Sequence, residues 1–344
     1  MDVRAPVEFL QGSLPGSVNL PIMDNEQRAR VGTAYKQQGR EVAIALGHEL
    51  VSGPVKEQRL ESWKTAIQQK PETVLYCFRG GLRSKITQRW LAEQGVHRPL
   101  IEGGFKQARQ FLRDATGLFS QQKNILLLSG PTGSAKTEIL KKASAFTPAL
   151  DLELLARHRG SAFGGMGHPQ PSQIDFENAL ALGLLQNNEV TATRPLLVED
   201  ESRLIGRCAV PEDFFARMRA SPVVFVEETF EQRVENILSD YVMATAIGRG
   251  HLLAGLEQFS AYRKSVQGIS KKLGGLRAQE LLQDIQVAET RFTLDQQDTE
   301  LNKNWIAKLL KYYYDPMYAS NLLKRNPQVL LRGDAKTILD YLSN

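Results

Sequence analysis

Cysteine is scarce in this sequence, and its scarcity limits both the cellular setting and the chemistry. The 344 residues include only Cys77 and Cys208, so a disulfide framework is excluded and a reducing cytosol is indicated. No spacing of histidine and cysteine suggests a zinc site. No apolar run approaches the length that crosses a membrane, and no secretory signal stands at the N-terminus. These absences predict a cytoplasmic protein with no membrane partner.

The remaining composition is that of an ordinary globular protein. Apolar residues make up 42% of the chain, which excludes extensive disorder, and the length allows two domains with a substantial core in each. The net charge is +5 and the pI is about 9.1. A basic protein can bind a polyanion, although many basic surfaces are simply solvated. Composition alone therefore does not identify a function.

Cys77 follows a short apolar run, Val74–Tyr76, that is typical of a buried strand. The loop after it contains two glycines and two arginines, Arg79 and Arg83, and leads into a predicted helix over Ile86–Glu93. Backbone amides of such a loop, a helix N-terminus and two positive charges all favour an anion. We therefore predict that Cys77 is a reactive thiolate and that both arginines belong to its site. The alternative is an inert cysteine at a strand end.

A second loop has the pattern of a phosphate-binding P-loop, because it follows the apolar strand Ile125–Leu128 and opens a helix from Glu138. The residues assigned to this phosphate site are Gly130, Thr132, Gly133, Ser134, Ala135, Lys136 and Thr137. The lysine would neutralise a phosphate, and the threonine hydroxyl could hold Mg²⁺. Ala135 stands where the pattern has glycine. The alternative is a tight strand-to-helix turn built from small residues.

Polar residues after two further strand ends are additional candidates for the P-loop site. They are Asp151, His158, Arg159, Ser161, Glu199, Asp200 and Arg203. Carboxylates at the end of a buried strand beside a P-loop could hold a metal or activate water. Equally, Asp151 could cap a helix, and the group from Glu199 to Arg203 could form solvent-facing ion pairs. We expect His158 to contact an anion or to be structural.

From about His251 the chain is predicted to be helical. Basic residues surround three consecutive tyrosines there: Lys303, Lys308, Lys311, Lys324 and Arg325 around Tyr312, Tyr313 and Tyr314. They could bind phosphates and stack an exposed base. For Tyr313 and Tyr318 we favour a packing role against the P-loop domain. Cys208 is expected in a loop, with a structural role only.

Segments on both sides of the cysteine loop resemble those of the rhodanese family, a parallel α/β sulfurtransferase fold. They are Asp2-Val3-Arg4, the run from Gly12 to Pro21, and Glu102-Gly103-Gly104-Phe105. In that family the loop cysteine carries a persulfide and the loop amides bind anions, so the resemblance implies a carrier role for Cys77. Almost nothing precedes Asp2, so either the chain is shortened or the sheet lacks an edge strand.

Over essentially its full length the chain resembles the tRNA 2-selenouridine synthase family, in which a rhodanese domain precedes a P-loop domain. The segments that carry this likeness are Tyr76–Gly81, Gly130–Thr137, Asp151–Glu153, His158–Gly164, Gln170–Gln173, Val198–Gly206 and Tyr313–Tyr318. The predicted fold class is α/β, with a rhodanese-like domain over 1–118, a P-loop NTPase-like domain over 119–250 and a helical region over 251–344. We expect the last region to pack on the P-loop domain and to contribute to tRNA binding.

The resemblance implies a two-stage reaction on the wobble 2-thiouridine of certain tRNAs. A geranyl group passes from geranyl diphosphate to the sulfur, and selenium from selenophosphate then replaces the S-geranyl group. No tightly bound cofactor is expected, and Mg²⁺ could accompany the phosphorylated substrates. Two alternatives stay open: a P-loop kinase or NTPase with a regulatory rhodanese domain, and a non-catalytic tRNA-binding or sulfur-relay protein.

Overall fold

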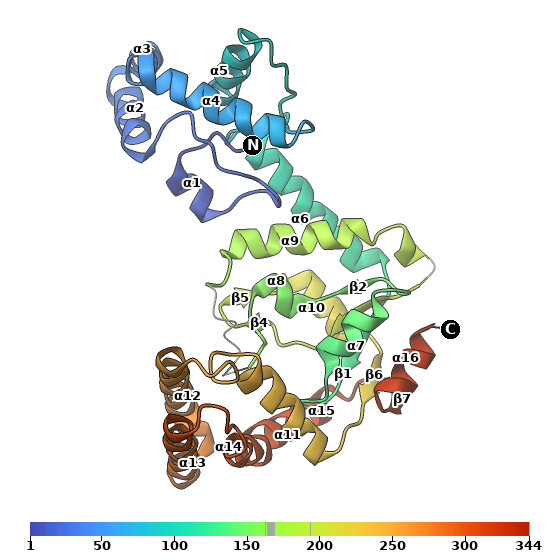
Figure 1. Ribbon diagram of the computed structural model, residues 1–344. Coiled ribbons are helices and arrows are strands. Elements are labelled where there is room, and N and C mark those ends of the chain that lie inside the picture. The colour runs from blue at the N-terminus through green and yellow to red at the C-terminus, as the bar shows by residue number, and fades with distance from the viewer. Residues whose placement is uncertain (162, 164–168, 193, 344) are drawn as a thin grey trace. The chain divides into compact units, whose positions relative to one another are not determined.

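The computed structural model describes residues 1–161, 163, 169–192 and 194–343 (Figure 1). These residues form two compact units, which are described separately. The first combines Met1–Leu118 with Pro171–Leu185, and the second combines Phe119–Gln170 with Gln186–Asn344. The predicted α/β class is confirmed, with a parallel sheet in the second unit and parallel bridges in the first.

The first unit is mostly helical, and its strand pairing is reduced to isolated parallel bridges. Asp2 bridges to both Asn19 and Tyr76, and Leu75 bridges to Leu100. Its helices are α1 (Pro6–Gln11), α2 (Asn25–Gln38), α3 (Arg40–Leu50), α4 (Gly53–Gln69), α5 (Leu82–Ala92), most of α6 (Gly104–Gln122) and nearly all of α9 (Gln173–Gln186). Helices α2 and α3 are separate because Gly39 between them has a φ of +90°. The bridges place the Cys77 loop at the end of a short extended segment, as predicted.

Helix α9 belongs to the first unit although it comes from the middle of the chain. Asp175 accepts hydrogen bonds from the Ser13 amide (2.7 Å) and hydroxyl (3.1 Å). Arg109 and Glu177 form an ion pair at 2.7 Å, with both side chains largely shielded from solvent. These contacts join to the first unit a segment that was predicted to belong to the 119–250 domain. No hydrophobic pattern in the sequence indicates these contacts.

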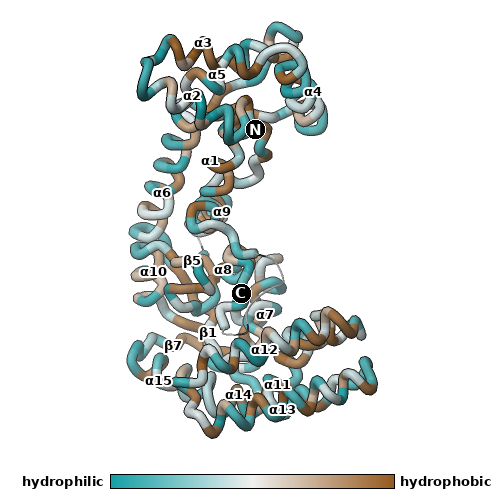
Figure 2. Tube along the Cα trace, turned by 90° about the vertical axis from the view of Figure 1, so that its left-hand side faces the viewer, coloured by the Kyte–Doolittle hydropathy of each residue, from teal (hydrophilic) through white to brown (hydrophobic). Residues whose placement is uncertain are grey.

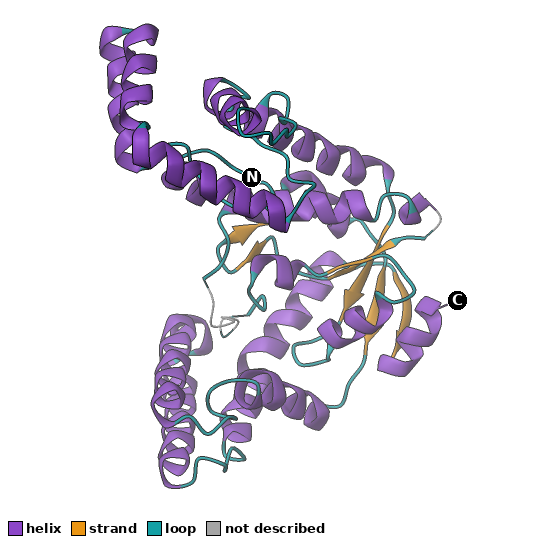
Figure 3. Ribbon diagram, turned by 45° about the horizontal axis from the view of Figure 1, so that its top comes forward, coloured by secondary structure: helices purple, strands orange, loops and turns teal. Residues whose placement is uncertain are grey.

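The second unit is built on a five-stranded parallel sheet with strand order β2-β3-β1-β6-β7. The strands are β1 (Ile125–Ser129), β2 (Ala149–Leu150), β3 (Leu196–Glu199), β6 (Val223–Val226) and β7 (Val329–Gly333) (Figure 3). The central strands β1, β3 and β6 are buried along their whole length, as expected of a parallel sheet covered on both faces. The carboxyl ends of β1 and β3 therefore lie side by side, and both lead into predicted site residues.

Helices cover this sheet and extend the second unit. They are α7 (Lys136–Ala143), α8 (Leu152–Ala156), α10 (Glu212–Arg219), α11 (Phe230–Leu238), α12 (Leu252–Leu273), α13 (Gly275–Leu294), α14 (Asn302–Leu309), α15 (Asp315–Arg325) and α16 (Ala335–Ser343). The second unit also contains the 3₁₀ turn Val190–Ala192, which precedes β3, and the π-helical turns Ser239–Met243 and Leu310–Tyr314. Along α12 and α13 apolar residues recur between polar ones (Figure 2). Their buried side chains share one core with Trp305.

Two predictions about the later part of the chain need correction. The region after His251 is not helical throughout, because Val329–Gly333 forms β7 at the edge of the sheet. Cys208 lies not in a loop but in the short strand β5 (Cys208–Ala209), which pairs with β4 (Leu204–Ile205). Its side chain is fully buried, which suits the structural role expected of it. Among the described residues, no helix is both long and apolar enough to cross a bilayer.

Candidate functional site

The Cys77 loop is fastened by the segment that follows the Leu100 bridge. The amides of Phe105 and Lys106 donate hydrogen bonds to the carbonyls of Cys77 and Phe78, both at 2.9 Å. Gly104 has a φ of +61°, and a β-carbon there would lie 2.3 Å from the Cys77 carbonyl oxygen. Only glycine allows the two segments to approach this closely. The Glu-Gly-Gly-Phe segment therefore holds the cysteine loop in shape.

The Cys77 thiol is buried, and its closest polar neighbour is Ser84 in the first turn of α5. The Sγ and Oγ atoms are 3.2 Å apart, and Cys77 is 3% exposed. Burial opposes ionisation, but hydrogen bonds from the Ser84 side chain and backbone and the charge of Arg83 outweigh it, so the pKa of Cys77 is lowered. A lowered pKa favours the nucleophilic thiolate at neutral pH. The sequence did not indicate the part that Ser84 plays.

Arg79 and Arg83, the two predicted site arginines, have different surroundings. Arg83 forms an ion pair with Glu8 of α1 at 2.5 Å, so part of its charge is already balanced. The Arg79 guanidinium lies over the Phe78 ring, 5.8 Å from its centroid. Glu8 was not predicted, because its role depends on α1 folding back against α5.

The Asp-x-Arg segment forms a buried ion pair beneath this loop. Asp2 and Arg4 are 0% and 2% exposed and lie 2.6 Å apart. The Arg4 guanidinium also donates to the Gly12 carbonyl at 2.8 Å and lies 4.0 Å from the centroid of the Phe105 ring. Asp2 and Arg4 thus support the segments that hold Cys77.

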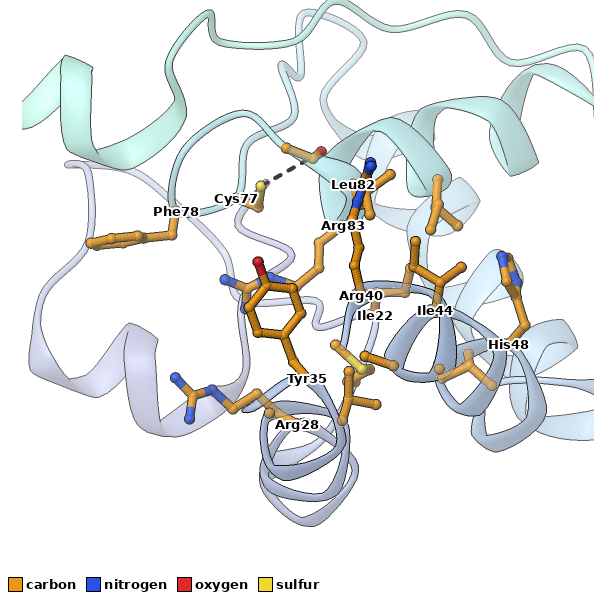
Figure 4. Close-up of a pocket in the computed structure, with 18 of the residues that line it drawn as sticks. Ile22, Arg28, Tyr35, Arg40, Ile44, His48, Cys77, Phe78, Leu82 and Arg83 are labelled. Carbon is orange, nitrogen blue, oxygen red and sulfur yellow. Dashed lines mark hydrogen bonds between the residues drawn. The ribbon is translucent and has the colours of Figure 1, made fainter. Parts of the chain in front are cut away.

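A cavity of about 950 Å³ opens beside Cys77 within the first unit. Figure 4 shows Arg28 and Tyr35 on one side of it and Leu82 and Arg83 on another. Helices α2, α3 and α5 supply most of its lining. The site is therefore a loop cysteine facing a large, partly apolar space, with several cationic side chains around it.

The predicted P-loop lies between β1 and α7 in the second unit. The Lys136 ammonium donates hydrogen bonds to the carbonyls of Gly130 (2.9 Å) and Pro131 (3.3 Å). Ser134 donates to the same Pro131 carbonyl at 2.8 Å. Ala135 has φ +57° and ψ +30°, the left-handed conformation that favours glycine. The alanine therefore has a backbone conformation that glycine adopts more readily.

Helix α11 holds the P-loop through two side chains. Arg233 donates to the Thr132 carbonyl and Asn236 to the Gly133 carbonyl, both at 2.8 Å. Arg233 is itself paired with Asp315 at 2.5 Å and is only 7% exposed. The aspartate of the Tyr-Tyr-Asp-Pro-Met-Tyr segment thus positions the arginine that braces the phosphate loop.

Three carboxylates gather beside Lys136 and Thr137. Glu153, Glu199 and Glu201 each offer an oxygen, and these oxygens lie within 4.8 Å of one another. The Thr137 hydroxyl donates to Glu153 at 3.5 Å. Glu199 is 1% exposed, and neither of its carboxylate oxygens has a hydrogen-bond partner among the described residues. Burial, followed by repulsion from neighbouring carboxylates, raises the pKa of Glu199 to about 8.

This donor set fits a Mg²⁺ ion. Mg²⁺ prefers oxygen ligands and is commonly held by one or two carboxylates together with substrate phosphates. The unpartnered oxygens of Glu199 require either a proton or a cation. The glutamates at positions 153 and 201 were not among the predicted site residues, although both stand within the segments used for the family resemblance. Asp151 is not part of the cluster; it caps α8, accepting a hydrogen bond from the Leu154 amide at 2.7 Å.

Asp200 and Arg203 are placed away from this cluster. Asp200 accepts from the Ser129 hydroxyl at 2.6 Å and pairs with Arg325 at 2.5 Å. Arg203 pairs with Glu212 near the surface. The residues from Glu199 to Arg203 therefore serve two purposes. Glu199 and Glu201 face the P-loop, whereas Asp200 and Arg203 form ion pairs.

The remaining candidates lie on one segment after α8. The Arg159 guanidinium donates to the Asp240 carbonyl and lies 5.1 Å from the Tyr241 ring centroid. Ser161 and Tyr241 share a hydrogen bond at 2.8 Å. Burial lowers the pKa of His158, which favours the neutral imidazole. Ala162 and Gly164 of the same family segment lie outside the described residues.

The basic residues near the C-terminal tyrosines are largely paired. Lys303 pairs with Glu235 at 2.6 Å, and Lys308 with Asp284 at 2.8 Å. The packing role favoured for Tyr318 is confirmed, because its hydroxyl lies 2.9 Å from the Ser129 hydroxyl. This region therefore has fewer free charges for RNA than its sequence suggests.

Comparison with known proteins adds independent information. A family model described as the tRNA 2-selenouridine synthase AAA domain matches residues 123–344, and a rhodanese-like domain model matches residues 1–110. A tRNA 2-selenouridine synthase from Nitrosomonas eutropha is 49% identical, covering 99% of this chain and 93% of its own length. The corresponding protein from Bdellovibrio bacteriovorus is 51% identical over 97% of this chain and 91% of its own length.

Proposed function

Because this chain belongs to the tRNA 2-selenouridine synthase family, we propose that it converts wobble 2-thiouridine in tRNA to 2-selenouridine through an S-geranyl intermediate. In the first stage the sulfur attacks C1 of geranyl diphosphate, and diphosphate leaves. In the second stage the selenium of selenophosphate attacks C2 of the base and the C2–S bond breaks, releasing geranyl thiol. Hydrolysis of the Se–P bond then releases phosphate.

The P-loop suits both small substrates because each carries phosphate. Its amides and Lys136 would hold the phosphate oxygens, and Mg²⁺ between Thr137 and the glutamate cluster would offset their charge. Neither stage requires nucleotide hydrolysis. A P-loop can act as a phosphate cradle alone, since hydrolysis also needs a positioned water.

Cys77 suits the second stage. Its thiol would donate a proton to the departing geranyl thiolate, and the lowered pKa of Cys77 makes it a stronger acid for that step. The thiolate left behind would then recover a proton from water. A selenosulfide carrier at Cys77 would need a two-electron oxidant that neither selenophosphate nor the protein supplies. The observation that carries the proposal is the presence, in one chain, of this activated cysteine and a P-loop flanked by carboxylates. We expect the protein to act in the cytoplasm on tRNA.

Nucleoside mass spectrometry tests the proposal directly. Wild-type protein is incubated with 2-thiouridine tRNA and geranyl diphosphate, and selenophosphate is then added. We expect S-geranyl-2-thiouridine first and 2-selenouridine second. Lys136→Ala should impair both products, whereas Cys77→Ser should form the geranylated nucleoside but not the selenated one. Full selenation by Cys77→Ser would refute the role given to the thiol.

The kinase or NTPase alternative gives a different result. It predicts steady nucleotide turnover that Lys136→Ala abolishes and Cys77→Ala leaves unchanged. The non-catalytic alternative predicts salt-sensitive tRNA binding without either modified nucleoside. The same samples, assayed for released phosphate and bound tRNA, distinguish all three.

A further inference from the structure

The cavity beside Cys77 has an apolar interior. Side chains from the loop before α2, from α2 and α3, and from α5 form it, and the apolar members central to the argument are Ile22, Val31, Ile44, Leu82, Ile86 and Trp90. An open space of about 950 Å³ with such walls leaves apolar surface in contact with water. That surface would be stabilised by an apolar occupant.

The edge of the same cavity is cationic. Five basic side chains line it: Arg28, Lys36, Arg40, Arg79 and Arg83. Among the described residues that line it, none is an aspartate or glutamate. Glu8 lies just outside and pairs with Arg83 at 2.5 Å and more loosely with Arg28 at 3.7 Å. The cavity therefore keeps an excess of positive charge around an apolar interior.

This combination matches an apolar chain attached to a polyanion. We propose that the cavity binds the ten-carbon geranyl chain of S-geranyl-2-thiouridine in tRNA during the second stage, with the basic edge contacting the RNA backbone. The proposal rests on the two-stage function above. Because Cys77 is among the residues that line the cavity, a chain bound there would place its thioether near the residue assigned to selenation. Free geranyl diphosphate is instead assigned to the P-loop, because the phosphate-binding elements lie there.

The segment that forms the wall supports a dedicated role. Both α2 and α3 lie in the segment between the bridged residues Asn19 and Leu75, directly before the Cys77 loop. Both helices turn side chains toward the cavity, as Figure 4 shows for Tyr35, Ile44 and His48. These two helices thus supply an apolar surface beside the loop that carries Cys77.

The test compares two RNA substrates and two matched variants. Short RNAs carrying either S-geranyl- or S-methyl-2-thiouridine are supplied with selenophosphate at limiting RNA concentration, and 2-selenouridine is quantified by mass spectrometry. Ile44→Asp puts a charge into the cavity. Val42→Asp makes the same change on α3 at a residue that does not line the cavity and is 43% exposed.

Wild-type protein should select the geranylated RNA over the methylated RNA by at least about tenfold, since each buried methylene favours binding. Ile44→Asp should lower the rate of 2-selenouridine formation from the geranylated RNA by about tenfold or more. It should leave the rate from the methylated RNA within about twofold of the wild-type rate. Val42→Asp should retain the wild-type preference. Ile44→Trp, which fills space without adding charge, should act like Ile44→Asp.

Two results would overturn the proposal. One is a wild-type protein without preference for the longer chain; the other is equal loss on both RNAs in folded Ile44 variants. If wild-type protein selenates neither RNA, the two-stage function fails, and binding measured by fluorescence anisotropy still tests the cavity. The proposal then requires S-geranyl RNA to bind at least about tenfold more tightly than 2-thiouridine RNA, with Ile44→Asp removing the difference. Equal binding would refute it.

Discussion

The sulfur of Cys77 lies 3.2 Å from the hydroxyl oxygen of Ser84, which stands in the first turn of α5. Both side chains are buried. The hydroxyl can donate a hydrogen bond to the thiolate, and the N-terminus of the helix adds a favourable potential. These interactions offset the burial that would otherwise hold the cysteine in its neutral form.

Ser84→Ala should therefore raise the pKa of Cys77 by roughly one unit, because a hydrogen bond to a charged group contributes about 1.5–3 kcal/mol. The pH dependence of iodoacetamide alkylation at Cys77, followed by peptide mass spectrometry, measures this shift. Ser62→Ala on α4 is the control, since Ser62 donates only to a carbonyl of its own helix. An unchanged profile in Ser84→Ala would mean that backbone hydrogen bonds and the charge of Arg83 set the pKa of Cys77.

Asp315→Asn should destabilise the second unit, because it leaves the buried Arg233 without its charged partner. We expect a loss of about 2–3 kcal/mol, less than for a fully buried pair because Asp315 is 33% exposed. Weaker phosphate binding should accompany it, since Arg233 holds the Thr132 carbonyl of the P-loop.

Thermal unfolding, with and without inorganic diphosphate, measures both effects. The control is Glu227→Gln, which removes an exposed ion pair with Arg332 and should cost less than about 0.5 kcal/mol. Equal losses of stability in Asp315→Asn and Glu227→Gln would show that the Arg233–Asp315 pair does not brace the P-loop.

Much of the architecture was predictable because it follows from local patterns. Apolar runs ending in glycine-rich loops identified strand β1 before Gly130 and the extended segment before Cys77, although that segment forms only isolated bridges. Lys136 and Thr137, singled out by the P-loop pattern, lie beside carboxylates. The strand β7 was missed because its positions are only half-buried or exposed, in alternation, and because it pairs with a strand about 100 residues earlier.

Which residues complete each site was harder to predict from the sequence, because it depends on contacts between segments that are far apart in the chain. Glu8 reaches Arg83 across 75 residues, and Asp315 reaches Arg233 across 82. The separation of Glu199 from its neighbour Asp200 follows from the strand pleat, which directs successive side chains to opposite faces. No spacing rule in the sequence selects which of the two joins the glutamate cluster.

Mg²⁺ should stabilise the protein more at high pH than at low pH. Burial and repulsion raise the pKa of Glu199 to about 8, above its ordinary 4.5. The folded state therefore holds a proton that the unfolded state releases, so metal-free stability falls as pH rises from about 4.5 to about 8. Mg²⁺ must displace that proton, so its stabilising effect grows over the same range.

Thermal unfolding with millimolar Mg²⁺, at about pH 6 and about pH 8.5, measures this dependence. Glu199→Gln should remove most of the Mg²⁺ response and make the metal-free protein more stable at the higher pH by about 1–3 kcal/mol. Glu231→Gln, at an exposed position in α11, should change neither. A Mg²⁺ response that is independent of pH and of Glu199 would place the ion elsewhere.

Ala135→Gly should stabilise the second unit, although most alanine-to-glycine changes destabilise proteins. Ala135 has a φ of +57°, and the left-handed conformation costs an L-residue about 1–2 kcal/mol, whereas glycine adopts it freely. Glycine also loses more chain entropy on folding, so we expect a net gain of about 0.5–1 kcal/mol.

Ala216→Gly, at an exposed position within α10, should lose about 1 kcal/mol. A gain in stability for Ala135→Gly together with a loss for Ala216→Gly, measured by thermal unfolding, would show that the wild-type P-loop retains backbone strain. Equal losses of stability in the two variants would show that contacts of the P-loop compensate for the strain. Because the variant keeps every amide of the loop, diphosphate binding should be equal to or tighter than that of the wild type.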